Sequence, residues 1–260
     1  MIITLLTDFG LEDEYAGVMK GVILSINPTA TVVDLCHLIP PGDVERAGWL
    51  LTWSWEFFPK GTVHVVVVDP GVGSSRKILC LPYKGHLFLA PDNGVLSPLL
   101  KDAGRHLQAF WVKNKSLFLP QVSNTFHGRD IFAPVAAHLA GGLAPRLLGP
   151  RLHSFKRLPV SLPSRRKKGL VGQVIQWDRF GNAVTNLPGQ LLRRLNGGFE
   201  IRVREHRIRG LQRSYSSASE GEPLAIVGSR GFLEIAVNGG SVARDLGLSI
   251  GDTVEVVRSR

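Results

Sequence analysis

Cysteine and methionine are scarce in this chain of 260 residues, which contains two of each. Cys36 and Cys80 lie in separate apolar segments without partners at metal-ligand spacing, so we expect two buried free thiols in a cytoplasmic protein. The eight histidines are scattered along the chain and form no H-x-x-x-H motif. The sequence therefore offers no ligand set for a metal ion, and we expect a site without one.

Long apolar runs are also missing, because no segment reaches the roughly 18 residues that a membrane-spanning helix needs. The first residues, "MIITLLTDFGLEDEY", carry no basic region and turn acidic at Asp8, so we expect neither a signal peptide nor a membrane partner. Residues 71–77, "GVGSSRK", match neither G-x-x-x-x-G-K-[ST] nor G-x-G-x-x-G. A loop that cradles phosphates therefore has little support.

Negative charge is in short supply, since 31 lysines and arginines outnumber 21 aspartates and glutamates and give a net charge of +10. Much of the excess lies in residues 165–168, "RRKK", and 202–213, "RVREHRIRGLQR". These patches lack the interleaved aromatic residues that stack on bases, so we do not expect nucleic acid as a partner. A basic nucleoside- or RNA-binding module without enzymatic activity remains an alternative, and it would bind RNA in a salt-sensitive manner.

Strands and helices alternate in the first half of the sequence. Buried strands are expected over residues 2–7, 31–35 and 62–69, with helices over 13–27, N-capped by Asp13, and from Pro41 or Asp43 onward. This order and spacing predict parallel βαβ units whose strands are covered on both faces. A strand pair over 77–83 and 86–94 follows, and then helices over 94–103 and 129–140.

The composition changes near residue 155. The segment "FKRLPVSLPSRRKKG" combines prolines, serines and a basic run, as is typical of a linker. Beyond it, short strand candidates alternate with glycine-rich turns. We predict an α/β N-terminal domain with a mainly parallel sheet over residues 1–158, a linker over 159–168 and a smaller all-β barrel domain over 169–260.

Acidic residues stand where the predicted strands end. Asp8 follows the first strand, Asp34 ends the second beside His37, and Asp69 follows the third in "VVVVDPGVGSSR". In open α/β sheets, ligands bind beyond the carboxyl ends of the strands, so Asp8 and Asp69 are expected to share one crevice. One such aspartate is more often a turn former, but two together favour a functional site.

Polar and aromatic residues combine at three further predicted turns: "NTFHGRDIFAP" (124–134), "WDRFGNAVTNL" (177–187) and "VGSRGFLEIAVNGGSVA" (227–243). Turn and cap chemistry is the simpler interpretation of each, as for Asp130 before a helix or Asn182 in a hairpin. An aromatic ring beside an amide also suits a purine, which needs stacking and edge hydrogen bonds.

Seven segments occur in order along the chain: "TLLTDFGLEDEYAGVMKGVI", "VVDLCHLIPPGDV", "FPKGTVHVVVVDPGVGSSR", "APDNGVLS", "TFHGRDIFAPVAAHLA", "DRFGNAVTN" and "SRGFLEIAVN". Together they resemble the S-adenosyl-L-methionine (SAM) hydroxide adenosyltransferases, or SAM hydrolases, which are related to the bacterial fluorinase and chlorinase. The resemblance implies an α/β domain, a β-barrel domain and a homotrimer with active sites at subunit interfaces. It also implies attack of water or hydroxide on the ribose C5′ of SAM, which gives adenosine and methionine without a cofactor.

Carried over residue by residue, the resemblance implies a catalytic set of Asp69, Arg76 and His127. Asp69 and His127 would orient a water molecule and accept its proton, while Arg76 would fix the carboxylate and favour hydroxide. Methionine leaves as a neutral thioether, so no general acid is needed.

The resemblance implies substrate-binding residues in both domains. Asp8 would accept hydrogen bonds from the ribose hydroxyls, and Phe126, beside Thr125, would pack on the nucleoside. Asn182 and the backbone around Val237 would read the adenine edge. The methionine part would be held by Asp13, Asp178, Ser229, Glu234 and, at its carboxylate, Arg230.

A halide-using SAM adenosyltransferase is the enzymatic alternative. In the fluorinase, the positions of Gly42, Asp69, Val72 and Gly128 carry tryptophan, tyrosine, threonine and serine. This chain has none of those four side chains, and Gly128 brings no hydroxyl donor for a halide ion. A buried anion without a donor is costly, which favours the hydrolase.

Overall fold

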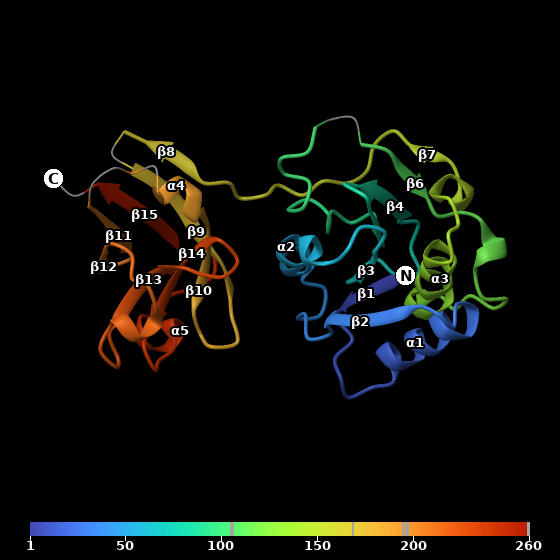
Figure 1. Ribbon diagram of the computed structural model, residues 1–260, viewed down its shortest axis with the longest axis horizontal. Coiled ribbons are helices and arrows are strands. Elements are labelled where there is room, and N and C mark those ends of the chain that lie inside the picture. Colours follow the sequence, from blue (N-terminus) through green and yellow to red (C-terminus); the bar gives the residue numbers. More distant parts are fainter. Residues whose placement is uncertain (105–106, 168, 194, 196–197, 259–260) are drawn as a thin grey trace. The chain divides into compact units, whose positions relative to one another are not determined.

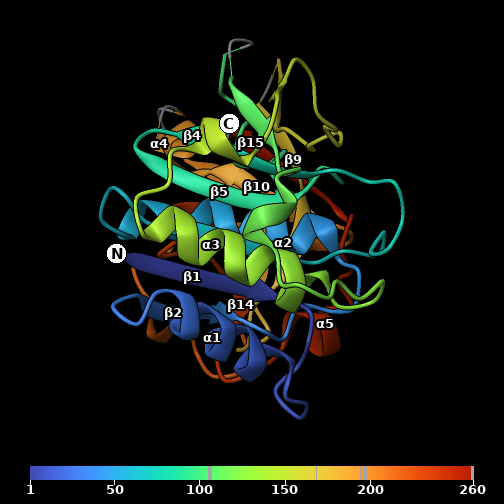
Figure 2. The same ribbon diagram turned by 90° about the vertical axis from the view of Figure 1, so that its right-hand side faces the viewer.

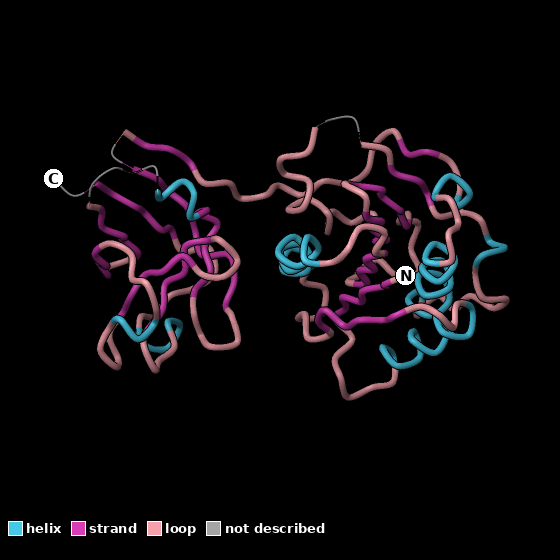
Figure 3. The backbone as a smooth tube through the Cα atoms, viewed as in Figure 1, coloured by secondary structure: helices cyan, strands magenta, loops and turns pink. Residues whose placement is uncertain are grey.

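The computed structural model describes residues 1–104, 107–167, 169–193, 195 and 198–258 (Figure 1). The chain forms two compact units, Met1–Val160 and Ser161–Arg260, each with its own apolar core. The first unit combines helices and strands, whereas the second is built mainly from strands, as Figure 3 shows. An α/β unit followed by a mainly β unit agrees with the predicted fold class.

The sheet of the first unit has the strand order β2-β1-β3-β5-β4-β6-β7. Its strands are β1 (Ile2–Thr7), β2 (Thr31–Cys36), β3 (Val63–Val67), β4 (Ile78–Tyr83), β5 (His86–Pro91), β6 (Ala109–Trp111) and β7 (Arg151–Leu152). β1 pairs in parallel with β2 and β3, and β3 pairs in parallel with β5. The carboxyl ends of β1 and β3 therefore meet at one edge, where Asp8 and Asp69 follow them.

The prediction of a mainly parallel sheet is wrong for the other half of this sheet. β4 is antiparallel to β5 and β6, and β6 is antiparallel to β7. The chain reverses between β4 and β5 at Lys84 and Gly85, whose φ angles are 47° and 85°. Two residues with positive φ form the tight turn that joins antiparallel strands, whereas a parallel pair requires a long crossover.

Helices cover both faces of the parallel half. α1 (Tyr15–Ile26) and α3 (Ala133–Ala140) lie side by side in front of β1 in Figure 2. Met19 of α1 belongs to the apolar core of that face. α2 (Val44–Ser54) covers the opposite face and buries Leu51 against it. Covering on both sides explains why β1 and β3 are nearly continuous apolar runs.

Two details of the predicted helices differ from the structure. α1 begins at Tyr15 and its N-cap residue is Glu14, so Asp13 is not the cap. Residues 94–103, predicted as a helix, form a series of turns. Asp43 does cap α2, because its side chain accepts a hydrogen bond from the backbone N–H of Arg46 at 3.0 Å.

The second unit is an antiparallel sheet in the order β12-β11-β15-β9-β10-β14-β13, with β8 paired to β9. Its strands are β8 (Ser164–Arg166), β9 (Gly169–Trp177), β10 (Ala183–Pro188), β11 (Phe199–Val203), β12 (His206–Arg209), β13 (Pro223–Val227), β14 (Phe232–Val237) and β15 (Thr253–Arg258), and its short helices are α4 (Gly189–Arg193) and α5 (Val242–Asp245). The N–H of Gln212, just after β12, donates to the carbonyl of Ala225 in β13 at 2.8 Å. The two ends of the sheet therefore approach each other, and the unit is a nearly closed barrel.

Part of the predicted linker belongs to this sheet. Ser164 lies opposite Val171 in an antiparallel pair, so residues 164–166 form a strand of the second unit. A polar, basic composition suggested a linker, but an edge strand tolerates exposed charges equally well. Within the described ranges, no helix has the length and apolar character needed to cross a membrane.

Candidate active site

A tight turn follows β3 and carries Asp69. The N–H of Val72 donates to the Asp69 carbonyl at 3.1 Å, and the Ser74 hydroxyl donates to the Gly71 carbonyl at 2.6 Å. Gly73 has a φ of +77°, in the left-handed region that favours glycine. The turn thus reverses the chain within a few residues and returns its later part to the end of the strand.

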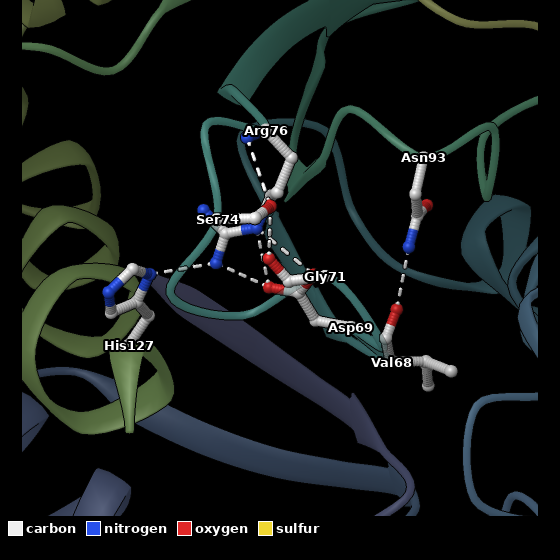
Figure 4. A network of polar contacts seen from close by, with 7 residues as sticks. All are labelled: Val68, Asp69, Gly71, Ser74, Arg76, Asn93 and His127. Carbon is white, nitrogen blue, oxygen red and sulfur yellow. Dashed lines mark hydrogen bonds and ion pairs between the residues drawn. The ribbon is translucent and has the colours of Figure 1, made fainter. Parts of the chain in front are cut away.

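Arg76 lies between Asp69 and His127 (Figure 4). Its Nε donates to Oδ1 and Oδ2 of Asp69 at 3.0 and 2.7 Å, and its Nη2 also contacts Oδ2. The same Nη2 lies 2.8 Å from Nδ1 of His127. The side chains of Asp69 and Arg76 are 4% and 11% exposed, so solvent screens their charges only weakly. The three residues predicted as catalytic are therefore joined in one polar network.

Arg76 determines the tautomer of His127. A guanidinium group only donates hydrogen bonds, so Nδ1 of His127 accepts and carries no proton. Burial lowers the pKa of His127 and the positive charge of Arg76 lowers it further, while Asp69 and Asp130 act in the opposite direction. His127 is therefore neutral near pH 7, with its proton on Nε2.

His127 immediately precedes η3 (Gly128–Phe132), a π-helical turn that leads into α3. Turns of this type are rare inside helices and recur at functional sites. Asp130, in the middle of η3, is fully buried. The segment before η3 carries two of the predicted substrate-binding residues, Thr125 and Phe126.

An aromatic cluster borders this segment. The ring of Phe126 packs edge-on against Phe9 and Tyr15, with centroids 5.7 and 5.0 Å apart. Gly128 lies directly behind the cluster, since an added Cβ would stand 3.1 Å from both Phe126 and Phe9 and 3.2 Å from Met19. A side chain at position 128 would therefore have to displace these neighbours.

The other predicted residues of the first unit lie in nearby loops. Asp8 follows β1, and its Oδ2 accepts a hydrogen bond from the N–H of Gly42 at 2.8 Å. Thr125 contacts the Ser123 hydroxyl through its N–H at 3.1 Å and its own hydroxyl at 3.0 Å. Asp13 is exposed in the segment before α1.

His37 holds the segment that carries Asp8. Its Nδ1 lies 2.8 Å from the hydroxyl of Thr7, and its carbonyl accepts the N–H of Gly10 at 2.8 Å. Its Nε2 lies 3.0 Å from Asp34, an ion-pair contact without hydrogen-bond geometry. The third strand-end carboxylate, Asp34, is thus engaged with His37.

The second unit contains a cavity of about 820 Å³. All six predicted binding residues of this unit line it: Asp178, Asn182, Ser229, Arg230, Glu234 and Val237. Asp178 accepts the N–H groups of Phe180 and Asn182 at 2.9 Å and the Asn182 amide at 2.8 Å. It therefore stabilises the hairpin turn between β9 and β10, as the simpler interpretation of this motif predicts.

Glu234 is a buried carboxyl in the wall of this cavity, 4% exposed. The hydroxyl of Tyr215 donates to its Oε2 at 2.9 Å, and Gly228 makes room for it, since a Cβ there would lie 2.0 Å from Oε1. Burial raises the pKa of Glu234; Tyr215 and Arg230 oppose the shift, and Asp178 adds to it. Burial also raises the pKa of Tyr215 to about 12, so its hydroxyl remains a donor.

The sequence-predicted site residues fall into two groups, one in each unit. The first lies in the loops of the first unit and includes the network of Asp69, Arg76 and His127, and the second lines the cavity. Sequence reasoning missed Tyr215, which lies in the polar stretch "RSYSSASE" without any periodic signal. It also interpreted Asp130 only as a helix cap. Among the described residues, no three histidine, cysteine, aspartate or glutamate side chains are grouped so as to hold a metal ion.

Comparison with known proteins links both units to one family. Residues 3–149 match the SAM hydroxide adenosyltransferase N-terminal domain, and residues 172–255 match the C-terminal domain. An (R)-S-adenosyl-L-methionine hydrolase from Thermus thermophilus is 41% identical over 97% of this chain and 98% of its own length. A fluorinase from Nocardia brasiliensis is 30% identical over 98% of this chain and 96% of its own. The crystal structure of a conserved protein from Thermotoga maritima has a TM-score of 0.92 at 39% identity, covering 99% of this chain and 100% of that one.

Proposed function

Because the chain belongs to the SAM hydroxide adenosyltransferase family, we propose that it hydrolyses SAM to adenosine and L-methionine. The observation that carries the proposal is the network of Asp69, Arg76 and His127 beyond the carboxyl end of β3. The Thermus hydrolase is 41% identical to this chain and the Nocardia fluorinase 30%, which favours water over halide as the nucleophile.

The proposed reaction is a substitution at the ribose C5′. The oxygen of a water molecule attacks C5′, the C5′–S bond breaks, and its electron pair stays on sulfur. The sulfonium thereby becomes the neutral thioether of methionine, and the attacking water loses one proton. Such a leaving group requires neither a general acid nor a metal ion. The protein has to aim the water in line with the C5′–S bond and take up its proton.

Asp69 is the proposed proton acceptor. A carboxylate has about four lone-pair positions, so Asp69 can accept from Arg76 and still accept from a water molecule. His127 is not assigned the same role, although the sequence-based interpretation gave it one. Its Nδ1 accepts from Arg76 and its Nε2 carries the proton on the far side of the ring from Asp69 (Figure 4), so His127 holds Arg76 in place instead. The water donates one hydrogen bond to Asp69, which leaves a lone pair free to face C5′.

Arg76 holds both partners. Its contacts with Asp69 keep the carboxylate in one orientation, and its contact with His127 fixes the guanidinium group itself. Its positive charge also stabilises hydroxide as the water proton moves to Asp69.

The binding residues are assigned as the resemblance implies. Asp8 accepts from the ribose hydroxyls, and Phe126, supported by Phe9 and Tyr15, packs on the nucleoside with Thr125 beside it. In the cavity of the second unit, the Asn182 amide and the Val237 backbone read the adenine edge. The methionine part is held by Asp13, Asp178, Ser229, Arg230 and Glu234.

The two groups of residues lie in different units, and in this proposal they combine between neighbouring subunits of a homotrimer. The family resemblance supports this assembly. Light scattering of the purified protein tests it, since it should give three times the mass of one chain. The proposed setting is the cytoplasm, in keeping with two free thiols, Cys36 and Cys80.

Chromatography of SAM incubations tests the function. Wild-type protein should release adenosine and methionine in equal amounts, with or without chloride. Asp69→Asn should lower kcat by about 10²- to 10⁴-fold, as loss of a general base does. Formation of 5′-chloro-5′-deoxyadenosine would identify a halogenase. Salt-sensitive RNA binding without SAM turnover would identify the non-enzymatic alternative.

A further inference from the structure

Asp130 is the most extensively bonded carboxylate next to the catalytic network, and no step of the proposed reaction uses it. Its side chain is 0% exposed, in the middle of η3 and three residues after His127. Arg129 binds it with two hydrogen bonds, Nε to Oδ1 at 2.6 Å and Nη2 to Oδ2 at 3.1 Å. A buried charge is retained only when such partners compensate its desolvation.

The remaining bonds of Asp130 reach back to the segment 119–126. Its Oδ2 accepts the N–H of Ser123 at 2.7 Å, and its carbonyl accepts the N–H of Leu119 at 3.0 Å. Its own N–H donates to the carbonyl of Phe126 at 3.2 Å. Asp130 therefore fixes this segment near its start, at its middle and at its end.

The fixed segment touches both parts of the site. The carbonyl oxygen of Asn124 lies so near Gly73 that an added Cβ there would stand 2.5 Å from it, which places the segment against the turn between Asp69 and Arg76. The guanidinium of Arg129 lies over the Phe126 ring, 5.2 Å from its centroid. The Asp130–Arg129 pair thus contacts Phe126 through Arg129, and it reaches the turn between Asp69 and Arg76 through the segment 119–126.

We propose that Asp130 is a positioning residue: it clamps the segment 119–126 and so aligns His127 with Arg76 and Phe126 with the substrate. The inference rests on the proposed roles of His127 and Phe126. Asp130 itself touches neither substrate nor water. Its side chain acts through the bond from the N–H of Ser123 and through its negative charge, whereas the bonds to Leu119 and Phe126 are made by its main chain.

The test compares kcat and KM of wild-type protein with those of Asp130→Asn over a pH series. Asparagine keeps an acceptor but loses the charge and one of the charge-assisted bonds, so kcat/KM should fall about 10- to 100-fold, as misplacement of reacting groups does. Because the Asp130 charge raises the pKa of His127, its removal should move the acid limb of the pH profile to lower pH. A purely structural role would leave that limb in place.

Glu200→Gln is the matched control. Glu200 accepts from Arg202 Nε at the same 2.6 Å, but it lies on β11, in the other unit of the chain. Its kcat/KM should equal that of the wild type. If Asp130→Asn fails to fold, the same kinetic measurements are made on Arg129→Gln. The Arg129 side chain is 38% exposed. Its replacement should also reduce kcat/KM. It should move the acid limb of the pH profile to higher pH, because the Asp130 charge near His127 is then uncompensated.

Wild-type kcat/KM in folded Asp130→Asn, or a loss of activity with an unmoved acid limb, would overturn the inference. Asp69→Asn and His127→Ala are assayed in parallel. If those two variants keep full activity, it is the proposed function that fails and not the positioning role alone.

Discussion

Replacement of His127 by glutamine and by alanine separates two possible roles of this residue. Nδ1 of His127 accepts from Arg76 at 2.8 Å, so the imidazole holds the guanidinium group in place. The amide oxygen of glutamine can reach the same guanidinium group and also accepts. Alanine presents nothing. Neither replacement can accept a proton from water at neutral pH.

The expected magnitudes follow from this geometry. A hydrogen bond from a charged guanidinium group is charge-assisted and worth roughly 1.5–3 kcal/mol. At about 1.4 kcal/mol per factor of ten, His127→Ala should lower kcat by about 10- to 150-fold. His127→Gln should recover at least about tenfold of that loss, because it restores an acceptor for Arg76.

The assay is adenosine release at saturating SAM, followed by chromatography between pH 5 and 9. Burial and Arg76 lower the pKa of His127 from 6.5, so protonation of Nδ1 should reduce wild-type activity only below that pH. The glutamine variant should lack this acid limb. Equal kcat values for the two variants, both about 10³-fold or more below wild type, would refute the role of His127 as an acceptor for Arg76 and restore it as the base.

Two substitutions of neighbouring groups give further tests. Gly128→Ala should lower kcat/KM several-fold, because the new Cβ, 3.1 Å from Phe126 and Phe9, displaces the aromatic cluster. The melting temperature should fall by only a few degrees. An unchanged KM for SAM would contradict the role of Phe126. Glu234→Gln should raise the KM for SAM at pH 8 and abolish its pH dependence. Burial raises the pKa of Glu234, so in the wild type the carboxylate that binds the methionine ammonium forms, and KM falls, only as pH rises through that elevated value. A KM that responds to pH equally in both proteins would show that another group is responsible.

The strand-end aspartates could be predicted because β1 and β3 are continuous apolar runs, which mark strands covered on both faces. The Asp69–Arg76 pair follows from a glycine turn that joins residues only seven apart. The inclusion of His127 came from family resemblance, since no spacing rule connects residues 51 apart. Its tautomer depends on which nitrogen faces Arg76, and only the side-chain geometry gives that.

The errors of the sequence analysis have physical causes. β4 is as apolar as the parallel strands, so periodicity does not give its direction. The signal was the Lys84–Gly85 turn, which requires positive φ at both positions. Residues 94–103 have an apolar pattern suited to a helix, but Pro98 in the middle lacks the N–H that a helix needs. Tyr215 reaches the cavity only because the barrel brings it to β14.

The separation of the three network residues along the chain also sets the entropy cost of bringing them together during folding. Asp69 and Arg76 close a loop of seven residues, whereas Arg76 and His127 are 51 residues apart. The longer closure costs about 2 kcal/mol more in chain entropy, which packing of α3 against the sheet must offset. On chain entropy alone, we expect the carboxylate–guanidinium pair to form first and the histidine to join it when α3 docks. A chain that ended before His127 would contain only the Asp69–Arg76 pair of this network.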